Sequence, residues 1–172
     1  ALMEAGELIA NEVSASRRER LIKVIQQYIP REKRERFFVT GRDGGKFALT
    51  HAKYFDRILV DAPCSGERHL LQSPMDLKEW TPNRSAQLAQ RQYALLTSAL
   101  MACKPGGRIL YSTCALSELE NDAVIERLIR KKANKFPFSV SFDYWQLPWV
   151  EQMEKLGCER TQYGVRIWPD QA

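Results

Sequence analysis

The feature that most constrains the fold is a regular alternation of short apolar runs with segments of helical periodicity. Four runs predict strands, at residues 7–10, 37–40, 55–61 and 108–112. Apolar side chains recur at helical spacing over about residues 15–28 and 83–103. Strands separated by helices predict an α/β fold, with a parallel sheet and helices on both faces.

A third helix is expected after the last of these strands. Ser117 followed by Glu120 matches a capping box, so the helix should begin there and run to about Lys132. The Ile58–Val60 run is continuously apolar, which predicts a strand covered on both faces. Further strands are expected at about 136–142 and 165–169, and residues 67–82 should form a long polar loop.

Side chains capable of chemistry gather where the predicted strands end. In parallel α/β sheets, ligands bind at the carboxyl ends of the strands. Five such residues fall at or just beyond these ends: Glu12, Asp43, Asp61, Cys64 and Cys114. Their shared location predicts a single functional site at this edge of the sheet.

The carboxylates alone leave alternatives open. Glu12 follows the first strand, where nucleotide-binding folds place an acidic residue that hydrogen-bonds ribose, but it could equally be a solvated carboxylate before a helix. Asp43 precedes two glycines and could accept the amino group of an adenine ring, although Asp-Gly is also a common turn pair.

The cysteines are more specific. Pro63 stiffens the chain between Asp61 and Cys64, and the following Ser65-Gly66 indicates a loop rather than a core cysteine. Cys114 ends the next strand, so the two loops are neighbours if the strands pair. Cys103 and Cys158 are interpreted as structural or incidental, and no disulfide framework is expected.

Composition excludes several classes of protein. The 172 residues fit one domain, and no run approaches the ~20 apolar residues of a membrane span. We expect no signal peptide, because residues 1–4 do not show a basic region followed by an apolar core. We therefore expect a cytoplasmic protein, unless a further segment targets it elsewhere. The cysteines and histidines lack the spacing of metal ligands.

The formal net charge of +5 mildly favours a polyanionic partner. Basic residues that could contact a nucleic-acid backbone occur at 31–36 and 130–132, although cations are expected at a helix C-terminus for stability alone. The sequence does not predict an oligomeric state.

Asp61-Ala-Pro-Cys-Ser-Gly66 and Tyr111-Ser-Thr-Cys114 resemble the two signature loops of the Nop/Sun-type RNA cytosine-5 methyltransferases. Other segments that resemble this family follow in the same order: Ile9–Glu12, Lys104–Gly107, Leu116 with Glu120-Asn121, and Val165–Pro169. The resemblance covers nearly the whole chain.

The resemblance implies a Rossmann-like class I methyltransferase that uses S-adenosylmethionine to methylate cytosine C5 in ribosomal or transfer RNA. Chemistry alone does not say which cysteine attacks the base. The family implies that Cys114 is the nucleophile, that Cys64 assists release, and that Asp61 contacts the base near N3. Residues implied to bind the cofactor are Glu12, Asp43 and Asp61, and those implied to bind substrate are Pro63 and Arg166.

The chain departs from the family pattern at both ends. The glycine-rich cofactor loop and first strand should precede Ala1, and a closing strand should follow Pro169. We therefore expect residues 1–172 to be a partial catalytic domain. Two other functions remain open: a DNA cytosine-5 methyltransferase that uses Cys64, and a non-catalytic RNA-binding or scaffold paralogue.

Overall fold

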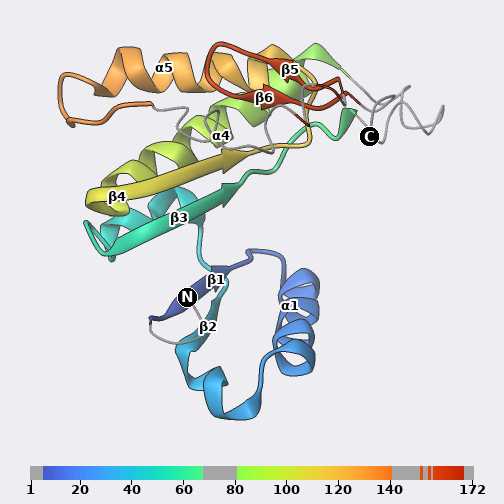
Figure 1. Ribbon diagram of the computed structural model, residues 1–172, viewed down its shortest axis with the longest axis vertical. Coiled ribbons are helices and arrows are strands. Elements are labelled where there is room, and N and C mark those ends of the chain that lie inside the picture. Colours follow the sequence, from blue (N-terminus) through green and yellow to red (C-terminus); the bar gives the residue numbers. More distant parts are fainter. Residues whose placement is uncertain (1–5, 68–80, 141–151, 153–154, 156, 169–172) are drawn as a thin grey trace.

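The computed structural model describes residues 6–67, 81–140, 152, 155 and 157–168 (Figure 1). Its strands are β1 (Leu8–Asn11), β2 (Phe37–Thr40), β3 (Phe55–Asp61), β4 (Cys103–Ser112), β5 (Glu159–Arg160) and β6 (Val165–Arg166). Its α-helices are α1 (Ala15–Tyr28), α4 (Pro82–Ala102) and α5 (Asp122–Lys132). Within the described residues, the 3₁₀ helices are η1 (Arg31–Arg36), η2 (Gly44–Leu49) and η3 (Glu118–Glu120).

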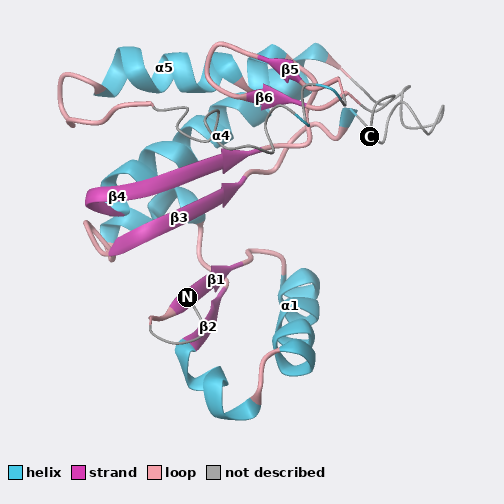
Figure 2. Cartoon of the chain, in the orientation of Figure 1, coloured by secondary structure: helices cyan, strands magenta, loops and turns pink. Residues whose placement is uncertain are grey.

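The strands form pairs rather than one continuous ladder (Figure 2). β1 is parallel to β2, and β3 is parallel to β4. The arrows of β1, β3 and β4 point the same way in Figure 1, so the carboxyl ends of both parallel pairs face the same side. β5 and β6 form a short antiparallel hairpin. The predicted α/β class with parallel strands is therefore confirmed.

The core lies between the β3–β4 pair and the helices α4 and α5, which cover one face of that pair. Leu96 of α4 packs with Val124 and Leu128 of α5, and all three are at most 5% exposed. Val60 and Ile109 pack against this cluster from the strands. Burial of these side chains is the main stabilising contribution in this part of the molecule.

The opposite face of β3–β4 has no such cover within the described residues. Leu59 is 66% exposed and Leu110 is 61% exposed, because side chains alternate between the faces of a strand. The expectation from Ile58–Val60 that both faces are covered is therefore met on one face alone in this part of the chain.

Several expected boundaries differ from the structure. β4 begins at Cys103, five residues before the expected start, because the Lys104–Gly107 turn continues the ladder with a register shift opposite Phe55 and Arg57. Residues 136–140 form no strand, and the rest of that expected strand lies outside the described residues, as does most of the 67–82 loop. Of the expected 165–169 strand, Val165–Arg166 are found as β6, residues 167–168 are not in a strand, and residue 169 lies outside the described residues.

The β1–β2 unit is more open. α1 and η1 contain no buried residue, and the same is true of the whole segment 6–43. Arg34 of η1 turns back on α1, where its Nε donates to the carbonyl of Ile29 at 2.8 Å and its Nη2 donates to that of Gln26. A cation at this position stabilises the helix C-terminus.

No helix within the described residues is long and apolar enough to cross a membrane.

Candidate active site

The two cysteine loops meet at the carboxyl ends of β3 and β4. Asp61 lies opposite Ser112 in the ladder, and Cys64 and Cys114 follow these two residues. The Sγ atoms of the cysteines are joined in a disulfide, with their Cα atoms 6.3 Å apart. The predicted convergence of the cysteine loops is therefore found, and the paired state was not anticipated from the sequence.

Asp61 and Pro63 lie on the exposed side of this edge. The Ser112 hydroxyl donates to Asp61 Oδ1 at 3.2 Å, and the Ala62 N–H donates to the Ser112 carbonyl at 2.9 Å. Pro63 is exposed, and its carbonyl accepts a 2.9 Å hydrogen bond from Gln92 Nε2 of α4. Asp61 therefore stands at the same edge as the cysteines, with part of its carboxylate directed to the neighbouring strand.

Glu67 connects the loop of Cys64 to the loop of Cys114. Its Oε2 accepts the N–H groups of Leu116 and Ser117 at 2.8 and 2.7 Å. The sequence predicted a capping box in which Glu120 would bond to the N–H of Ser117. That prediction was wrong: Ser117 precedes η3 and caps Leu119, and Glu67 takes the position expected for Glu120.

Glu120 is fully buried and makes the opposite connection. Its Oε2 accepts the Ser65 N–H at 2.9 Å and Gln92 Nε2 at 2.8 Å. Its backbone carbonyl accepts the Tyr111 hydroxyl at 2.7 Å. Burial raises the pKa of that hydroxyl well above its usual range, with a smaller contribution from the Glu120 carboxylate. Tyr111 therefore stays a hydrogen-bond donor at physiological pH.

Asn121 completes the contacts of the Cys114 loop. It accepts the Thr113 hydroxyl at 2.6 Å and donates from Nδ2 to the carbonyls of Ala115 and Ser117, each at 2.9 Å. The side chain of Glu120 thus holds the Cys64 loop, and that of the neighbouring Asn121 holds the Cys114 loop.

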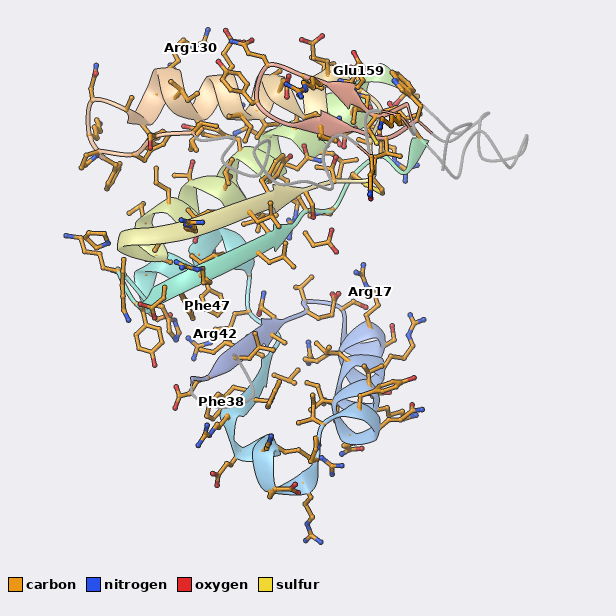
Figure 3. The ribbon with its side chains drawn as sticks, in the orientation of Figure 1. Arg17, Phe38, Arg42, Phe47, Arg130 and Glu159 are labelled. Carbon is orange, nitrogen blue, oxygen red and sulfur yellow. A yellow bond between two sulfur atoms is a disulfide. The ribbon has the colours of Figure 1, made fainter. Side chains whose placement is uncertain are left out.

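Glu12 lies just beyond β1, as predicted, and its carboxylate is held by residues at the start of α1. Its Oε1 accepts the Ser14 N–H at 2.8 Å, and its Oε2 pairs with Arg17 Nε at 2.9 Å. Arg17 is 67% exposed on the surface of α1 (Figure 3). These contacts fix the carboxylate at the edge of the strand, and each oxygen keeps a further lone pair.

Asp43 lies beyond β2, and its Oδ1 accepts the Gly45 N–H at 3.0 Å at the start of η2. Asn11 holds this loop against β1. Its Oδ1 accepts the Thr40 hydroxyl and the Arg42 N–H at 2.7 and 2.9 Å, and its Nδ2 donates to the Arg42 carbonyl at 2.9 Å. Asn11 therefore keeps the loops of Glu12 and Asp43 side by side.

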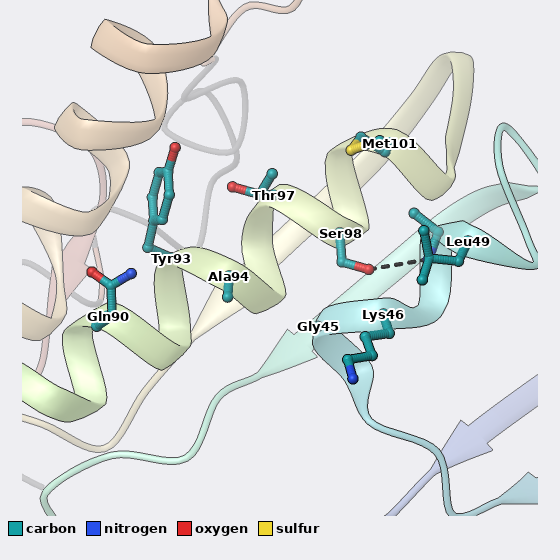
Figure 4. A pocket seen from close by; sticks show the side chains of 10 residues that line it. Gly45, Lys46, Leu49, Gln90, Tyr93, Ala94, Thr97, Ser98 and Met101 are labelled. Atoms are coloured by element: carbon teal, nitrogen blue, oxygen red, sulfur yellow. Dashed lines mark hydrogen bonds between the residues drawn. The ribbon is translucent and has the colours of Figure 1, made fainter.

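Two adjoining hollows separate η2 from α4. One, of about 370 Å³, is lined by Asp43 together with side chains of α4 from Gln87 to Leu95. The other, of about 290 Å³, lies where Lys46 and Leu49 face Ser98 and Met101 (Figure 4). The Ala48 N–H donates to Ser98 Oγ at 3.1 Å, which ties η2 to the helix.

Arg166 is placed in the β5–β6 hairpin, where Nη1 pairs with Glu159 at 3.2 Å and the guanidinium lies 5.3 Å from the centre of the Trp168 ring. Trp168 Nε1 also donates to Glu159 at 3.0 Å. The hairpin joins the start of α5, because Asp122 accepts from Thr161 and from Gln162. Within the described residues, the side-chain contacts of Arg166 are thus with Glu159 and Trp168 and not with a cysteine loop.

In both basic segments that the sequence suggested for nucleic-acid contact, 31–36 and 130–132, a cation lies at the C-terminus of a helix. Arg34 is used to cap α1, so it contributes less to a nucleic-acid surface than the sequence suggested. Arg130 points outward from α5 (Figure 3), at the helix end where a cation is favourable for stability alone.

Burial raises the pKa of Cys103, which agrees with its interpretation as a structural thiol. No cluster of metal-ligating side chains occurs among the residues described.

Sequence reasoning missed Asn11, Glu67 and Gln92 as residues that shape the site. Asn11 directly precedes the predicted ligand Glu12 at a strand end, which is a usable signal. Gln92 is a polar residue on the apolar side of a helix and is fully buried, so its position in the periodic pattern also pointed to a role. Glu67 had no local signal, because its partners lie 49 and 50 residues away.

The arrangement of parallel strands, cysteine loops and acidic strand ends is that of the Rossmann-like methyltransferase fold. A solved structure of NSun6 from Pyrococcus horikoshii with SFG shares the fold, with a TM-score of 0.60 and 30% identity over 73% of this chain and 31% of that one.

The model of the family "16S rRNA methyltransferase RsmB/F" matches residues 1–172, and the chain belongs to this family. It is 37% identical over 150 residues to the 5-cytosine rRNA methyltransferase NSUN4 of Mus musculus, a match covering 83% of this chain and 39% of that protein. It is 41% identical over 139 residues to the ribosomal RNA small subunit methyltransferase F of Shewanella sediminis, covering 81% of this chain and 27% of that protein. The chain thus spans well under half of these relatives.

Proposed function

We propose that this chain is the catalytic part of an S-adenosylmethionine-dependent enzyme that methylates C5 of cytosine in ribosomal RNA through a covalent cysteine adduct. The observation that carries the proposal is the meeting of Cys64 and Cys114 at the ends of two paired parallel strands. The names of the relatives favour ribosomal over transfer RNA as the substrate.

The residues of the β1–β2 edge fit the adenosine part of this cofactor. The carboxylate of Glu12 suits ribose hydroxyls, and Asp43 beside its 370 Å³ hollow suits the amino group of adenine. The related NSun6 structure is described with SFG, an analogue of S-adenosylmethionine. When bound, the cofactor supplies an electrophilic methyl group on a sulfonium.

The cysteines supply the chemistry that the base lacks, because C5 of cytosine is a weak nucleophile. Addition of the reduced Cys114 thiolate to C6 shifts electrons toward C5, and Asp61 favours that addition through a hydrogen bond near N3. Loss of the C5 proton with expulsion of the Cys114 thiolate then restores the aromatic ring, a step that Cys64 assists. Pro63 and Arg166 are proposed to contact the RNA, whose target base must be unstacked to enter.

A scaffold role is the second candidate, because both cysteines can be retained in a paralogue without activity. It predicts RNA binding without methyl transfer. A DNA methyltransferase is disfavoured, since it requires Cys64 alone and leaves Cys114 without a function.

The roles of the cysteines can be tested with the full-length protein, reducing agent, cofactor and ribosomal RNA. We expect Cys64→Ala to accumulate a covalent protein–RNA adduct on a denaturing gel, because the adduct forms and is not released. Cys114→Ala should form none.

Cys103→Ser is the matched control, since this buried cysteine lies at the other end of β4, and it should behave as the wild type does. An adduct from Cys114→Ala but not from Cys64→Ala would reverse the assignment. RNA binding without adduct or methyl transfer from any form would support the scaffold.

A further inference from the structure

Each of the two cysteine loops contributes a glutamate whose carboxylate accepts hydrogen bonds from the other loop. Glu67, three residues after Cys64, accepts two N–H groups of the loop that follows Cys114. Glu120, six residues after Cys114, accepts the N–H of Ser65, which directly follows Cys64. Each loop is therefore held by a side chain that belongs to the other.

Contacts that are buried are well suited to fix the distance between the two cysteine loops. Glu120 and Gln92 are 0% exposed and Ser65 is 3% exposed, so water does not compete for their hydrogen bonds. Gln92 Nε2 donates both to Glu120 and to the Pro63 carbonyl, which ties the Cys64 loop to α4. Hydrogen bonds to a charged acceptor are stronger than neutral ones, and those of Glu67 measure 2.7 and 2.8 Å.

Each carboxylate uses a single oxygen for its contacts with the other loop. Both N–H donors bond to Oε2 of Glu67, and Ser65 and Gln92 both bond to Oε2 of Glu120. Glu120 Oε1 has no partner among the described residues. One carbonyl oxygen would therefore serve equally well in geometry, so glutamine should replace either glutamate better than alanine does.

We propose that Glu67 and Glu120 are positioning residues that set the separation of Cys64 and Cys114. This inference rests on the proposed function for its consequence in catalysis, since attack by one cysteine and release by the other require both sulfurs at one base. The separation itself can be measured without any substrate.

The experiment compares reduced full-length wild type with variants equilibrated in glutathione buffers. In this exchange the two protein thiols reduce glutathione disulfide to two glutathione molecules and become a disulfide, and the equilibrium constant is the effective concentration of the thiol pair. Peptide mapping identifies the Cys64–Cys114 bond. We expect Glu67→Ala and Glu120→Ala to lower the constant at least tenfold, and Glu67→Gln to restore most of it.

Glu118→Ala is the matched control, because Glu118 is an exposed glutamate in η3 two residues from Glu120, and it should leave the constant unchanged. If Glu120→Ala does not fold, the half-buried Glu67 decides the question through its alanine and glutamine variants. An unchanged constant in folded Glu67→Ala would overturn the proposal, as would a loss that Glu67→Gln fails to restore.

Methylation assays on the same samples separate the two proposals. If both hold, Glu67→Ala lowers kcat while KM for RNA changes little. If wild type transfers no methyl group, the proposed function fails, and the thiol equilibrium still decides whether the two glutamates set the separation.

Discussion

The two parallel strand pairs carry the residues proposed for function at their carboxyl ends, but they support these residues in different ways. Below the cysteines, β3–β4 packs on α4 and α5, and the loops are held by buried polar groups such as Gln92 and Glu120. Below Glu12 and Asp43, the residues proposed to hold the cofactor, no residue of segment 6–43 is buried, and the loops are held by exposed Asn11 and by the Glu12–Arg17 pair.

This contrast matches the task proposed for each edge. Covalent chemistry depends on reacting atoms held within a fraction of an ångström, which favours buried contacts that water cannot replace. Holding a cofactor through hydroxyl and amino groups tolerates more movement. The largest consequences of substitution should therefore appear in the β3–β4 unit.

The sharpest test of this contrast is the core itself. Leu128→Ala removes a 5% exposed side chain between α5 and α4 and should destabilise the 172-residue chain by about 2–5 kcal/mol. Val24→Ala in α1, at 49% exposure, should change stability by less than about 0.5 kcal/mol. Urea unfolding measures both, and equal effects would mean that the two units are supported alike.

Sequence reasoning succeeded where structure is determined locally. Helical periodicity gave α1 its observed bounds, and short apolar runs gave those of β2 and β3. The same reasoning placed Glu12, Asp43, Asp61 and both cysteines at strand ends. These assignments depend on patterns within a dozen residues, which packing in this fold does not overrule.

It failed where partners are distant in sequence. Ser117 and Glu120 fit a capping box by spacing, but Glu67 from the other cysteine loop reaches the Ser117 N–H instead and leaves Glu120 to bond Ser65. The extended start of β4 likewise depends on pairing with β3, which local turn signals at Lys104–Gly107 did not indicate. The residues that hold the site in place were therefore harder to predict than the residues of the site itself.

Two glycines test the same contrast by adding a single methyl group. A Cβ at Gly107 would lie 2.9 Å from the Lys104 carbonyl, 3.0 Å from the Asp56 carbonyl and 2.5 Å from Cys103 Sγ, so the β3–β4 backbone must shift. We expect Gly107→Ala to cost about 1–3 kcal/mol.

The matched change in the other unit is Gly41→Ala, whose Cβ would meet the guanidinium of Arg18. That flexible side chain can move at the price of its hydrogen bonds to the carbonyls of Glu12 and Val13. The loss of stability should therefore be smaller than for Gly107→Ala in the same urea unfolding experiment. A larger loss at Gly41 would show that segment 6–43 is more tightly constrained than its exposure indicates.

Asn11 should contribute only modestly to stability, and the main effect of its removal should appear in cofactor binding. Asn11→Ala removes three exposed hydrogen bonds from β1 to Thr40 at the end of β2 and to Arg42 in the loop of Asp43, with an expected loss of about 1 kcal/mol in stability, since exposed bonds are readily replaced by water. Because the loops of Glu12 and Asp43 are then free to separate, the Kd for S-adenosylmethionine should rise about tenfold in calorimetric titration of the full-length protein. Asn11→Asp keeps the oxygen that accepts from Thr40 and Arg42 but replaces the Nδ2 donor with an acceptor that faces the Arg42 carbonyl, so its Kd should fall between those of wild type and Asn11→Ala. Equal Kd values for all three forms would mean that the exposed contacts of Asn11 do not hold the cofactor edge, and the contrast between the two strand pairs would then be one of stability alone.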